Sequence, residues 1–370
     1  MEATLSLSKA LVFSLLRSHL TREESPCTGA TLEQWQEAIK YAVAHRVVLL
    51  LYTHLKSHPQ DVPESILLRL KRLYRINAAD NLRLEKELQT IIAMLAAENI
   101  PCMPIKGIVL SYLLYEDPAI RPVVDLDILV QPHHLDRVLD LLLARGYAWT
   151  VHADRMRSRW YRRISHHVAL IHQERRIILE VHGKLVQPNR ARPVAGERIW
   201  QRALKWHLGD YEYEGLSLED LTAYLVSHSA KEYFGSVLQI HEIAVLLLRQ
   251  QPGSWRILWQ RAAEHHCRRR LKIYLALMRQ AFALDLTPPA LLALVPELAQ
   301  PLTRREKFLL QVSLEQLLGQ DTEACRTRPL KLWYDFWIAD NPVDRLVVLW
   351  HKVRLVLVKL SASLQLSRVT

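Results

Sequence analysis

The spacing of apolar residues divides the chain into a helical first part, a mixed middle and a helical last part. Up to residue 97, apolar side chains recur every three or four positions, the period of a helix with one buried face. Thr31-Leu-Glu-Gln34 is a capping box that begins one such helix. A longer pattern runs from Pro63 to Ala97, and the polar residues from Asn77 to Asn81 predict a break within it.

Short apolar runs, some of them alternating with polar residues, follow this part of the chain. Gly107 and Pro132 each precede a short apolar segment that predicts a helix, and Gly146 predicts the end of the second helix. Five segments predict strands: 100–105, 123–130, 147–152, 166–172 and 176–182. The first is expected at a sheet edge, and the last two are expected to form a hairpin across 173–175. This alternation of helix and strand predicts a small mixed sheet.

The helical period returns after residue 195. Ser217-Leu-Glu-Asp220 resembles a capping box, and apolar spacing predicts further helices at 237–249, 255–263, 270–284 and 289–299. We therefore expect an α+β, mostly helical fold with a small mixed β-sheet core. The expected parts are an N-terminal helical region (1–97), the sheet core (98–195) and a C-terminal helical domain (196–370).

Composition and charge narrow the partners and the compartment. The 370 residues carry a formal charge of +11, which favours polyanionic partners such as nucleotides. The four cysteines form no CxxC pair and the first residues lack a signal-peptide pattern, so we expect a cytoplasmic protein. The run 346–360 is too short and too charged to span a bilayer. A helix packed on the core is favoured there over peripheral contact with a membrane.

Two acids one residue apart lie in the predicted strand 123–130. Side chains two positions apart on a strand point to the same side, so Asp125 and Asp127 share one face. The opposite face carries an apolar stripe of Val124, Leu126, Ile128 and Val130. Paired carboxylates suit Mg²⁺, which takes oxygen ligands and is commonly bound together with the phosphates of a substrate. The pair therefore indicates phosphate chemistry.

The segment 176–182 repeats this arrangement. Its apolar residues alternate with Glu180 and His182, which share the other face. If the two strands are neighbours, three carboxylates converge on one open face. An Asp-x-Asp motif alone is short and often occurs by chance, but the strand setting, the preceding Lys106-Gly107 turn and the matching Glu180 strengthen it.

Together these residues resemble the nucleotidyltransferases of the polymerase-beta-like superfamily, and within it a bacterial family described as uncharacterised nucleotidyltransferases. The resemblance extends from about Trp35 into the helices after Glu242. It rests on Pro104-Ile-Lys106-Gly107, Tyr115-Glu-Asp-Pro118, Arg121, Asp125-Leu-Asp127-Ile-Leu-Val130, Gly146-Tyr147, Leu179-Glu180-Val-His182, His228 and Lys231.

The resemblance implies that Asp125, Asp127 and Glu180 are catalytic and bind two Mg²⁺ ions, with Mn²⁺ as an alternative. Glu180 could also take the proton of the acceptor hydroxyl. Lys106-Gly107 stands where the superfamily usually has a glycine-serine pair that holds phosphates at a helix N-terminus. This departure leaves open whether a nucleotidyl or a simple phosphoryl group is transferred.

Four further residues are expected to bind the nucleotide, and each has a structural alternative. Arg121 would contact the triphosphate, or else pair with Glu116 or Asp117. His182 would orient the acids or contact the acceptor. The other two are His228 and Lys231, which lie three positions apart on one predicted helix. They would either face the cleft or lie in the interior.

The expected function is transfer of a nucleoside monophosphate from a nucleoside triphosphate to an acceptor hydroxyl. The acceptor is a small molecule, sugar, peptide or protein, and the resemblance suggests tailoring of a natural product or polysaccharide. The alternatives are kinase-like phosphoryl transfer from the same site, and a non-catalytic module that binds nucleotide or RNA. We expect no stable nucleic-acid complex. The segment Glu264-His-His-Cys267 is not expected to bind zinc, since adjacent histidines seldom share one tetrahedral ion.

Overall fold

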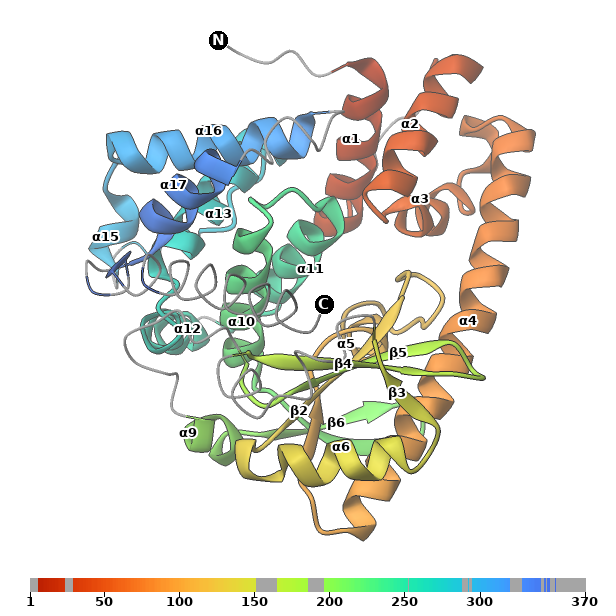
Figure 1. Ribbon diagram of the computed structural model, residues 1–370. Helices are drawn as coiled ribbons and strands as arrows, with labels where there is room; N and C mark the ends of the chain where they lie inside the picture. The colour runs from red at the N-terminus through yellow and green to blue at the C-terminus, as the bar shows by residue number, and fades with distance from the viewer. Residues whose placement is uncertain are drawn as a thin grey trace, which may run out of the picture.

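The computed structural model describes residues 6–23, 29–150, 165–185, 196–251, 253–287, 295–319 and 328–340, with a few isolated positions besides. Within this part of the chain, helices surround a small mixed sheet, as the α+β, mostly helical prediction required (Figure 1). The α-helices are α1 Leu7–Thr21, α2 Leu32–Ala44, α3 Val48–Leu55, α4 Glu64–Ala97, α5 Ile108–Tyr115, α6 Leu135–Leu143, α9 Gly196–Gln201, α10 Leu218–Lys231, α11 Val237–Leu248, α12 Ser254–Glu264, α13 Arg268–Phe282, α15 Pro296–Ala299, α16 Arg304–Leu318 and α17 Arg328–Ile338. Two short 3₁₀ helices are η1 Pro59–Asp61 and η2 Pro132–His134.

The central sheet has five strands in the order β1-β2-β5-β4-β3. Strands β2 and β5 run parallel, and the other neighbouring pairs are antiparallel. All five predicted strands are confirmed, including the edge position of β1 and the hairpin β4–β5. Their bounds are β1 Cys102–Pro104, β2 Asp125–Val130, β3 Tyr147–Trp149, β4 His167–His172 and β5 Ile177–His182.

A second hairpin, β6 Leu204–Leu208 and β7 Tyr211–Gly215, lies where we predicted only helices. Its turn contains Gly209 with a φ of +57° followed by Asp210, and glycine tolerates this left-handed backbone without steric cost. The prediction of an unbroken helical region after residue 195 is therefore wrong at this hairpin. The strands are only five residues long, so their period of two was outweighed by the helical pattern around them.

The predicted break in the long N-terminal pattern is also wrong, because α4 runs without interruption along the molecule (Figure 1). Its polar residues Asn77 and Asn81 lie one turn apart on one face and bind the loop before β2. The side-chain amide of Asn77 donates to the Ala119 and Arg121 carbonyls at 2.7 and 3.1 Å. Asn81, which is fully buried, donates to the Pro118 carbonyl and to that of Arg121. Polar side chains here hold a loop and do not end a helix.

Two hydrophobic clusters hold these elements together. One covers the back of the sheet with the second half of α4 and with α6, including Leu88, Leu95, Val138 and Leu142. The other joins α1–α3 to α10, α11, α13 and α16. Residues from both ends of the described chain thus share one cluster. The division into 1–97, 98–195 and 196–370 stays a prediction.

The described helices include none that is long and apolar enough to cross a membrane. Several predictions concern residues outside the described part of the chain. These are most of the run 346–360, Cys27, Cys325 and part of the predicted helix 289–299. Cys102 and Cys267 are both buried.

Candidate active site

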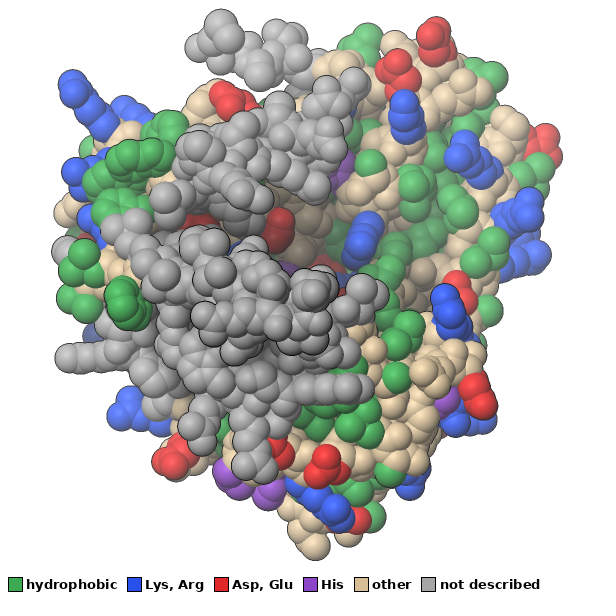
Figure 2. All heavy atoms as spheres, viewed as in Figure 1, with side chains coloured by type: hydrophobic (Ala, Val, Ile, Leu, Met, Phe, Trp, Pro, Cys, Tyr) green, Lys and Arg blue, Asp and Glu red, His purple; other side chains and the backbone are tan. Residues whose placement is uncertain are grey.

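Asp127 of β2 and Glu180 of β5 lie directly opposite each other in the parallel strand pair. Opposed residues on neighbouring strands point to the same face, so the two carboxylates meet. Asp125 is paired with Ile178 and, two residues before Asp127, points to this face as well. The three predicted acids therefore share one face of the sheet. Figure 2 shows acidic, basic and histidine side chains in a hollow near the centre of the molecule.

The opposite face of these strands anchors the acids. Leu126, Ile128, Leu179 and Val181 are at most 1% exposed and belong to the cluster behind the sheet. A shift of either strand by one residue would expose this row and bury the carboxylates without partners. Val124 is the exception to the predicted apolar stripe: it precedes β2 and is 55% exposed, so that part of the prediction is wrong.

Lys106 and His182 both bind Asp127. The Lys106 ammonium and the His182 Nε2 atom each lie 2.9 Å from Asp127 Oδ1, and Glu180 Oε2 lies 3.3 Å from the same ring nitrogen. Burial alone would raise the pKa of Asp127, but the hydrogen bond from His182 and the charge of Lys106 hold that pKa well below its usual range. Asp127 is therefore ionised at neutral pH.

Asp125 has a different electrostatic environment. Burial raises its pKa, and the negative charges of Asp127 and Glu180 raise it further, against the opposing effects of Lys106 and Arg121. Burial also acts to raise the pKa of Glu180, but the His182 hydrogen bond lowers it below the usual value. The face thus carries an excess of negative charge at Asp125, which a bound cation would relieve.

Gly107 joins β1 to α5 in a conformation reserved for glycine. Its φ is +65° and its ψ is −130°, and a Cβ atom there would lie 3.1 Å from the Asp125 carbonyl oxygen. The backbone at the start of α5 therefore approaches β2 beside the first acid. Helix N-termini bind anions through free backbone N–H groups. The phosphate roles of Gly107 and Lys106 stay predictions, and the Lys106 ammonium is bound to Asp127 and to the Tyr224 hydroxyl.

Arg121 forms an ion pair that the sequence did not predict. Its guanidinium Nε lies 2.5 Å from Oε1 of Glu242 on α11. The predicted partners Glu116 and Asp117 are wrong: the Asp117 carboxylate accepts a hydrogen bond from Tyr74 at 2.7 Å. Arg121 is near enough to the acids to lower the pKa of Asp125. Its contact with a triphosphate stays a prediction.

His228 and Lys231 lie on α10, on the same helix as Tyr224. Burial lowers the pKa of His228 well below its usual value, and the charges of Lys106 and Lys231 lower it further. Asp127 also acts on this pKa, in the opposite direction, so His228 is close to the acids. Nucleotide binding by His228, Lys231 and His182 stays a prediction.

His166 and His167 belong to the same cluster and were not predicted. His167 is paired with His182 across β4 and β5, and its Nε2 lies 3.7 Å from Glu180 Oε1. Its Nδ1 lies 2.9 Å from His166 Nε2. Burial lowers the pKa of His167 to about 4, although Glu180 acts to raise it. Counting back from the predicted turn at 173–175 places His166 opposite His182, whereas the observed register, with His172 opposite Ile177, pairs His167 with His182.

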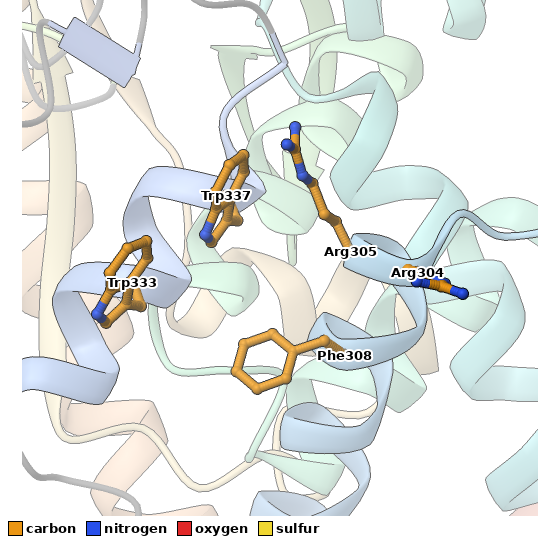
Figure 3. A pocket seen from close by; sticks show the side chains of 5 residues that line it. All are labelled: Arg304, Arg305, Phe308, Trp333 and Trp337. Carbon is orange, nitrogen blue, oxygen red and sulfur yellow. The ribbon is translucent and has the colours of Figure 1, made fainter.

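A separate groove of about 310 Å³ lies between α16 and α17 (Figure 3). Its walls are Arg304, Arg305, Phe308, Trp333 and Trp337, and the Arg305 guanidinium lies 3.9 Å from the centre of the Trp337 ring. The groove has no carboxylate or histidine among these residues. Its described lining therefore contains arginines but no ligand that could hold a metal ion for phosphate transfer.

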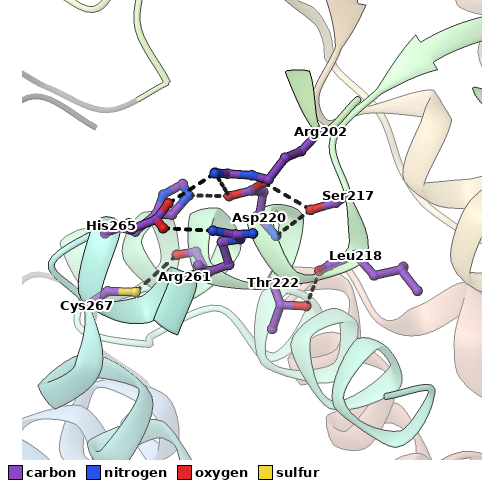
Figure 4. Close-up of polar contacts among 10 residues, drawn as sticks. Arg202, Ser217, Leu218, Asp220, Thr222, Arg261, His265 and Cys267 are labelled. Atoms are coloured by element: carbon purple, nitrogen blue, oxygen red, sulfur yellow. Dashed lines mark hydrogen bonds and ion pairs between the residues drawn. The ribbon is translucent and has the colours of Figure 1, made fainter. Parts of the chain in front are cut away.

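Asp220 is the centre of a second polar cluster (Figure 4). Its buried carboxylate accepts two hydrogen bonds from the Arg202 guanidinium at 2.8 and 2.9 Å, one from His265 Nε2 at 2.9 Å and one from the Ser217 hydroxyl at 3.0 Å. Ser217 and His265 both bind the carboxylate, unlike a nucleophilic triad, in which histidine lies between serine and aspartate. The Cys267 thiol donates to the Ala223 carbonyl. These contacts join the segment after α9 to α10 and to the end of α12.

Two sets of side chains in the described structure could hold a metal ion: Asp127, Glu180 and His182, and the histidines His166, His167 and His182. Within each set the ligand atoms lie within 4.8 Å of one another. Both sets include His182 and lie on the same face of the sheet.

Comparison with known proteins agrees with the geometry. No curated protein matches the chain. A family model described as uncharacterised nucleotidyltransferase matches residues 31–283, which include the sheet, the acids, α10 and α11. The chain therefore belongs to this family of uncharacterised nucleotidyltransferases.

Proposed function

We propose that this protein is a magnesium-dependent enzyme that transfers a nucleoside monophosphate from a nucleoside triphosphate to an acceptor hydroxyl. The observation that carries the proposal is the parallel register of β2 and β5, which sets Asp127 opposite Glu180 with Asp125 on the same face. Family membership supports nucleotidyl transfer in general. The acceptor class proposed is a small molecule, sugar, peptide or protein.

The donor set suits Mg²⁺. Asp125, Asp127 and Glu180 supply carboxylate oxygens, the ligands that hard cations prefer, and no cationic side chain among the described residues forms an ion pair with Asp125 as Lys106 does with Asp127. We propose that these three residues hold two Mg²⁺ ions, with Mn²⁺ as an alternative. When bound, such ions neutralise the triphosphate and leaving group and make the attacking hydroxyl more acidic.

The remaining residues prepare the site for the reaction. His182 holds the carboxylates of Asp127 and Glu180 in place through one ring nitrogen. Lys106 offsets the buried charge of Asp127 and is positioned to turn toward a phosphate oxygen when a cation takes its place. Glu180, ionised and partly exposed, accepts the proton of the acceptor hydroxyl.

Three further residues complete the proposed nucleotide site. One is Arg121 in the loop before β2, and the other two are His228 and Lys231 on α10. Arg121 holds the loop that leads into Asp125 by pairing with Glu242, and its charge favours a triphosphate nearby. The backbone of Gly107 brings the first turn of α5 beside Asp125, where N–H groups bind phosphate oxygens. His228 and Lys231 contact the nucleotide from α10.

The position of a radioactive label distinguishes the two transfer reactions. The protein is mixed with Mg²⁺ and nucleoside triphosphates labelled at the α- or γ-phosphate, together with a panel of sugars, peptides and proteins, and alone. We expect the α-label to enter an acceptor, with release of pyrophosphate. Transfer of the γ-label with release of a nucleoside diphosphate would identify kinase-like transfer instead.

Matched variants link the reaction to the acids. Asp127→Asn should abolish labelling, whereas Asp140→Asn, at an exposed position on α6, should leave it unchanged. Equal labelling by Asp127→Asn and the unchanged protein would refute the proposed site. Steeply salt-dependent RNA binding without turnover of any triphosphate would favour the non-catalytic alternative.

A further inference from the structure

Three imidazoles meet beside the carboxylates. One ring nitrogen of each of His166, His167 and His182 lies within 4.8 Å of the others. The centres of the rings of His166 and His167 are 4.2 Å apart, and those of His167 and His182 are 5.2 Å apart. His182 is 2% exposed, and the other two are partly buried. Few side-chain types other than histidine bind transition metals as strongly, so this convergence calls for a chemical explanation.

The backbone explains how two adjacent histidines turn to the same side. His167 is the first residue of β4, and His166 precedes the strand. The His166 carbonyl accepts hydrogen bonds from the Gly183 and Lys184 N–H groups at 3.1 and 3.4 Å. His166 is therefore free of the strict alternation of a strand, and its Nε2 comes within 2.9 Å of His167 Nδ1. At that distance one of the two nitrogens must carry a proton.

We propose that His166, His167 and His182 form a binding site for a first-row transition metal ion of the Zn²⁺ class, with Glu180 as the fourth ligand. Zinc–nitrogen bonds of about 2.0–2.1 Å in a tetrahedron place ligand atoms roughly 3.3 Å apart, so the three nitrogens, which lie within 4.8 Å of one another, must come closer by rotation of their side chains. Glu180 Oε1 lies 3.7 Å from His167 Nε2, whereas His166 faces the other ring nitrogen, Nδ1, so the His167 ring must turn for one of its nitrogens to bind the shared ion. A set of three histidines and a carboxylate prefers Zn²⁺ or Co²⁺ over Mg²⁺.

The site borders the carboxylates proposed to hold Mg²⁺ and shares His182 and Glu180 with them. His182 has one ring nitrogen on Asp127 and Glu180, whereas its buried Nδ1 makes no hydrogen bond in the described structure. Binding of Zn²⁺ would draw Glu180 and His182 toward His166 and His167 and away from Asp127. The ion therefore changes the same face on which the proposed nucleotidyl transfer takes place.

Metal binding is measured without nucleotide, so the result does not depend on the proposed reaction. Metal-free protein is titrated with Co²⁺, and its visible absorption reports the coordination. Tetrahedral binding through nitrogen gives intense bands, which Zn²⁺ should abolish by displacement and excess Mg²⁺ should not. We expect one such ion per chain. Weak bands of a six-coordinate ion, or displacement by Mg²⁺, would overturn the assignment.

Variants locate the ion. His166→Ala/His167→Ala should lower the affinity for Co²⁺ by more than the roughly 100-fold that loss of an outer partner costs. The matched control is His133→Ala/His134→Ala, which removes another adjacent pair with rings 4.1 Å apart from η2 and should leave the spectrum unchanged. Unchanged affinity in the first variant would refute the site. A thermal unfolding curve shows whether the double variant is folded. The single variant His167→Gln, which changes one ring only, is titrated beside it. The titration of the unaltered protein tests the site without any substitution.

Asp125→Asn separates this inference from the proposed function. The variant should lose nucleotidyl transfer but keep the tetrahedral Co²⁺ spectrum, since Asp125 is not among the four ligands. Loss of the spectrum in Asp125→Asn would place the ion among the aspartates and contradict the histidine site. A protein that transfers nucleotides but shows no tetrahedral spectrum would retain the proposed function and lose only this inference.

Discussion

Arg121 and Glu242 form a buried ion pair that ties the loop before β2 to α11. The Arg121 Nε lies 2.5 Å from Glu242 Oε1, and the Glu242 side chain is 1% exposed. The two residues are 121 positions apart in the sequence. This contact fixes where β2 begins and therefore where Asp125 lies relative to the helices.

Removing one charge of this pair should be costly. Arg121→Met or Glu242→Gln is expected to lower the free energy of unfolding, by about 3–5 kcal/mol for Arg121→Met, because the remaining charge stays buried without a partner. The double variant Arg121→Met/Glu242→Leu should recover most of this loss. Urea unfolding of all variants measures the coupling. A loss below about 1 kcal/mol in Arg121→Met would contradict a buried pair and would favour a free guanidinium.

Asp125 and Asp127 should respond in opposite directions to replacement by asparagine. In metal-free protein at neutral pH, Asp125→Asn should raise the thermal midpoint, because it removes a carboxylate whose ionisation the fold disfavours. Asp127→Asn should lower the midpoint, because Lys106 and His182 lose their charged partner. Both should abolish nucleotidyl transfer. Equal shifts of the midpoint in the two variants would refute the electrostatic difference.

The acid branch of the stability curve should depend on Asp127. Its pKa is lower in the folded protein than in the unfolded chain, so its contribution is present above the usual carboxylate value of about 3.9 and is lost as the pH falls below it. Asp127→Asn should therefore reduce the loss of stability with falling pH in this range. Urea unfolding between neutral pH and about pH 3 measures the slope, with Asp140→Asn as the control.

Gly107→Ala should destabilise the fold through the backbone. Its positive φ with negative ψ costs about 1–3 kcal/mol for a residue with a Cβ atom, and the added carbon would meet the Asp125 carbonyl at 3.1 Å. Gly253→Ala is the control, since its φ is −72° and a Cβ there meets nothing within 4 Å. That change should stay within about 0.5 kcal/mol in thermal or urea unfolding. Equal effects of the two variants would show that Gly107 is not required.

Asn81→Ala should loosen the loop that precedes the acids. Its amide donates to the carbonyls of Pro118 and Arg121, and losing these hydrogen bonds at a fully buried position should cost about 1–3 kcal/mol. Asn81→Asp should be no better, because a carboxylate cannot donate to a carbonyl. Hydrogen exchange of residues 118–125 measures the effect directly. Unchanged hydrogen exchange in both variants would show that the contacts of α4 do not hold the loop that positions Asp125.

Much of the local structure could be predicted from the pattern of residues. Alternation in Asp125–Val130 and Ile177–His182 assigned the acids to one face and the apolar residues to the other, because the strand period is two. Lys106-Gly107 marked the turn before α5, and Thr31 and Ser217 marked helix starts that the structure confirms. Polar residues at Asn77 and Asn81 misled the prediction, because their hydrogen-bond partners belong to a loop some 40 positions away.

The sequence by itself thus determined which side chains share a face, since that depends on backbone geometry over a few residues. Only the tertiary structure decided which faces meet. The parallel register that sets Asp127 against Glu180, the Lys106–Asp127 and Arg121–Glu242 ion pairs, and the meeting of His166 and His167 with His182 all join separate segments. Such contacts depend on the burial of whole strands and helices against common cores, and no local period encodes them.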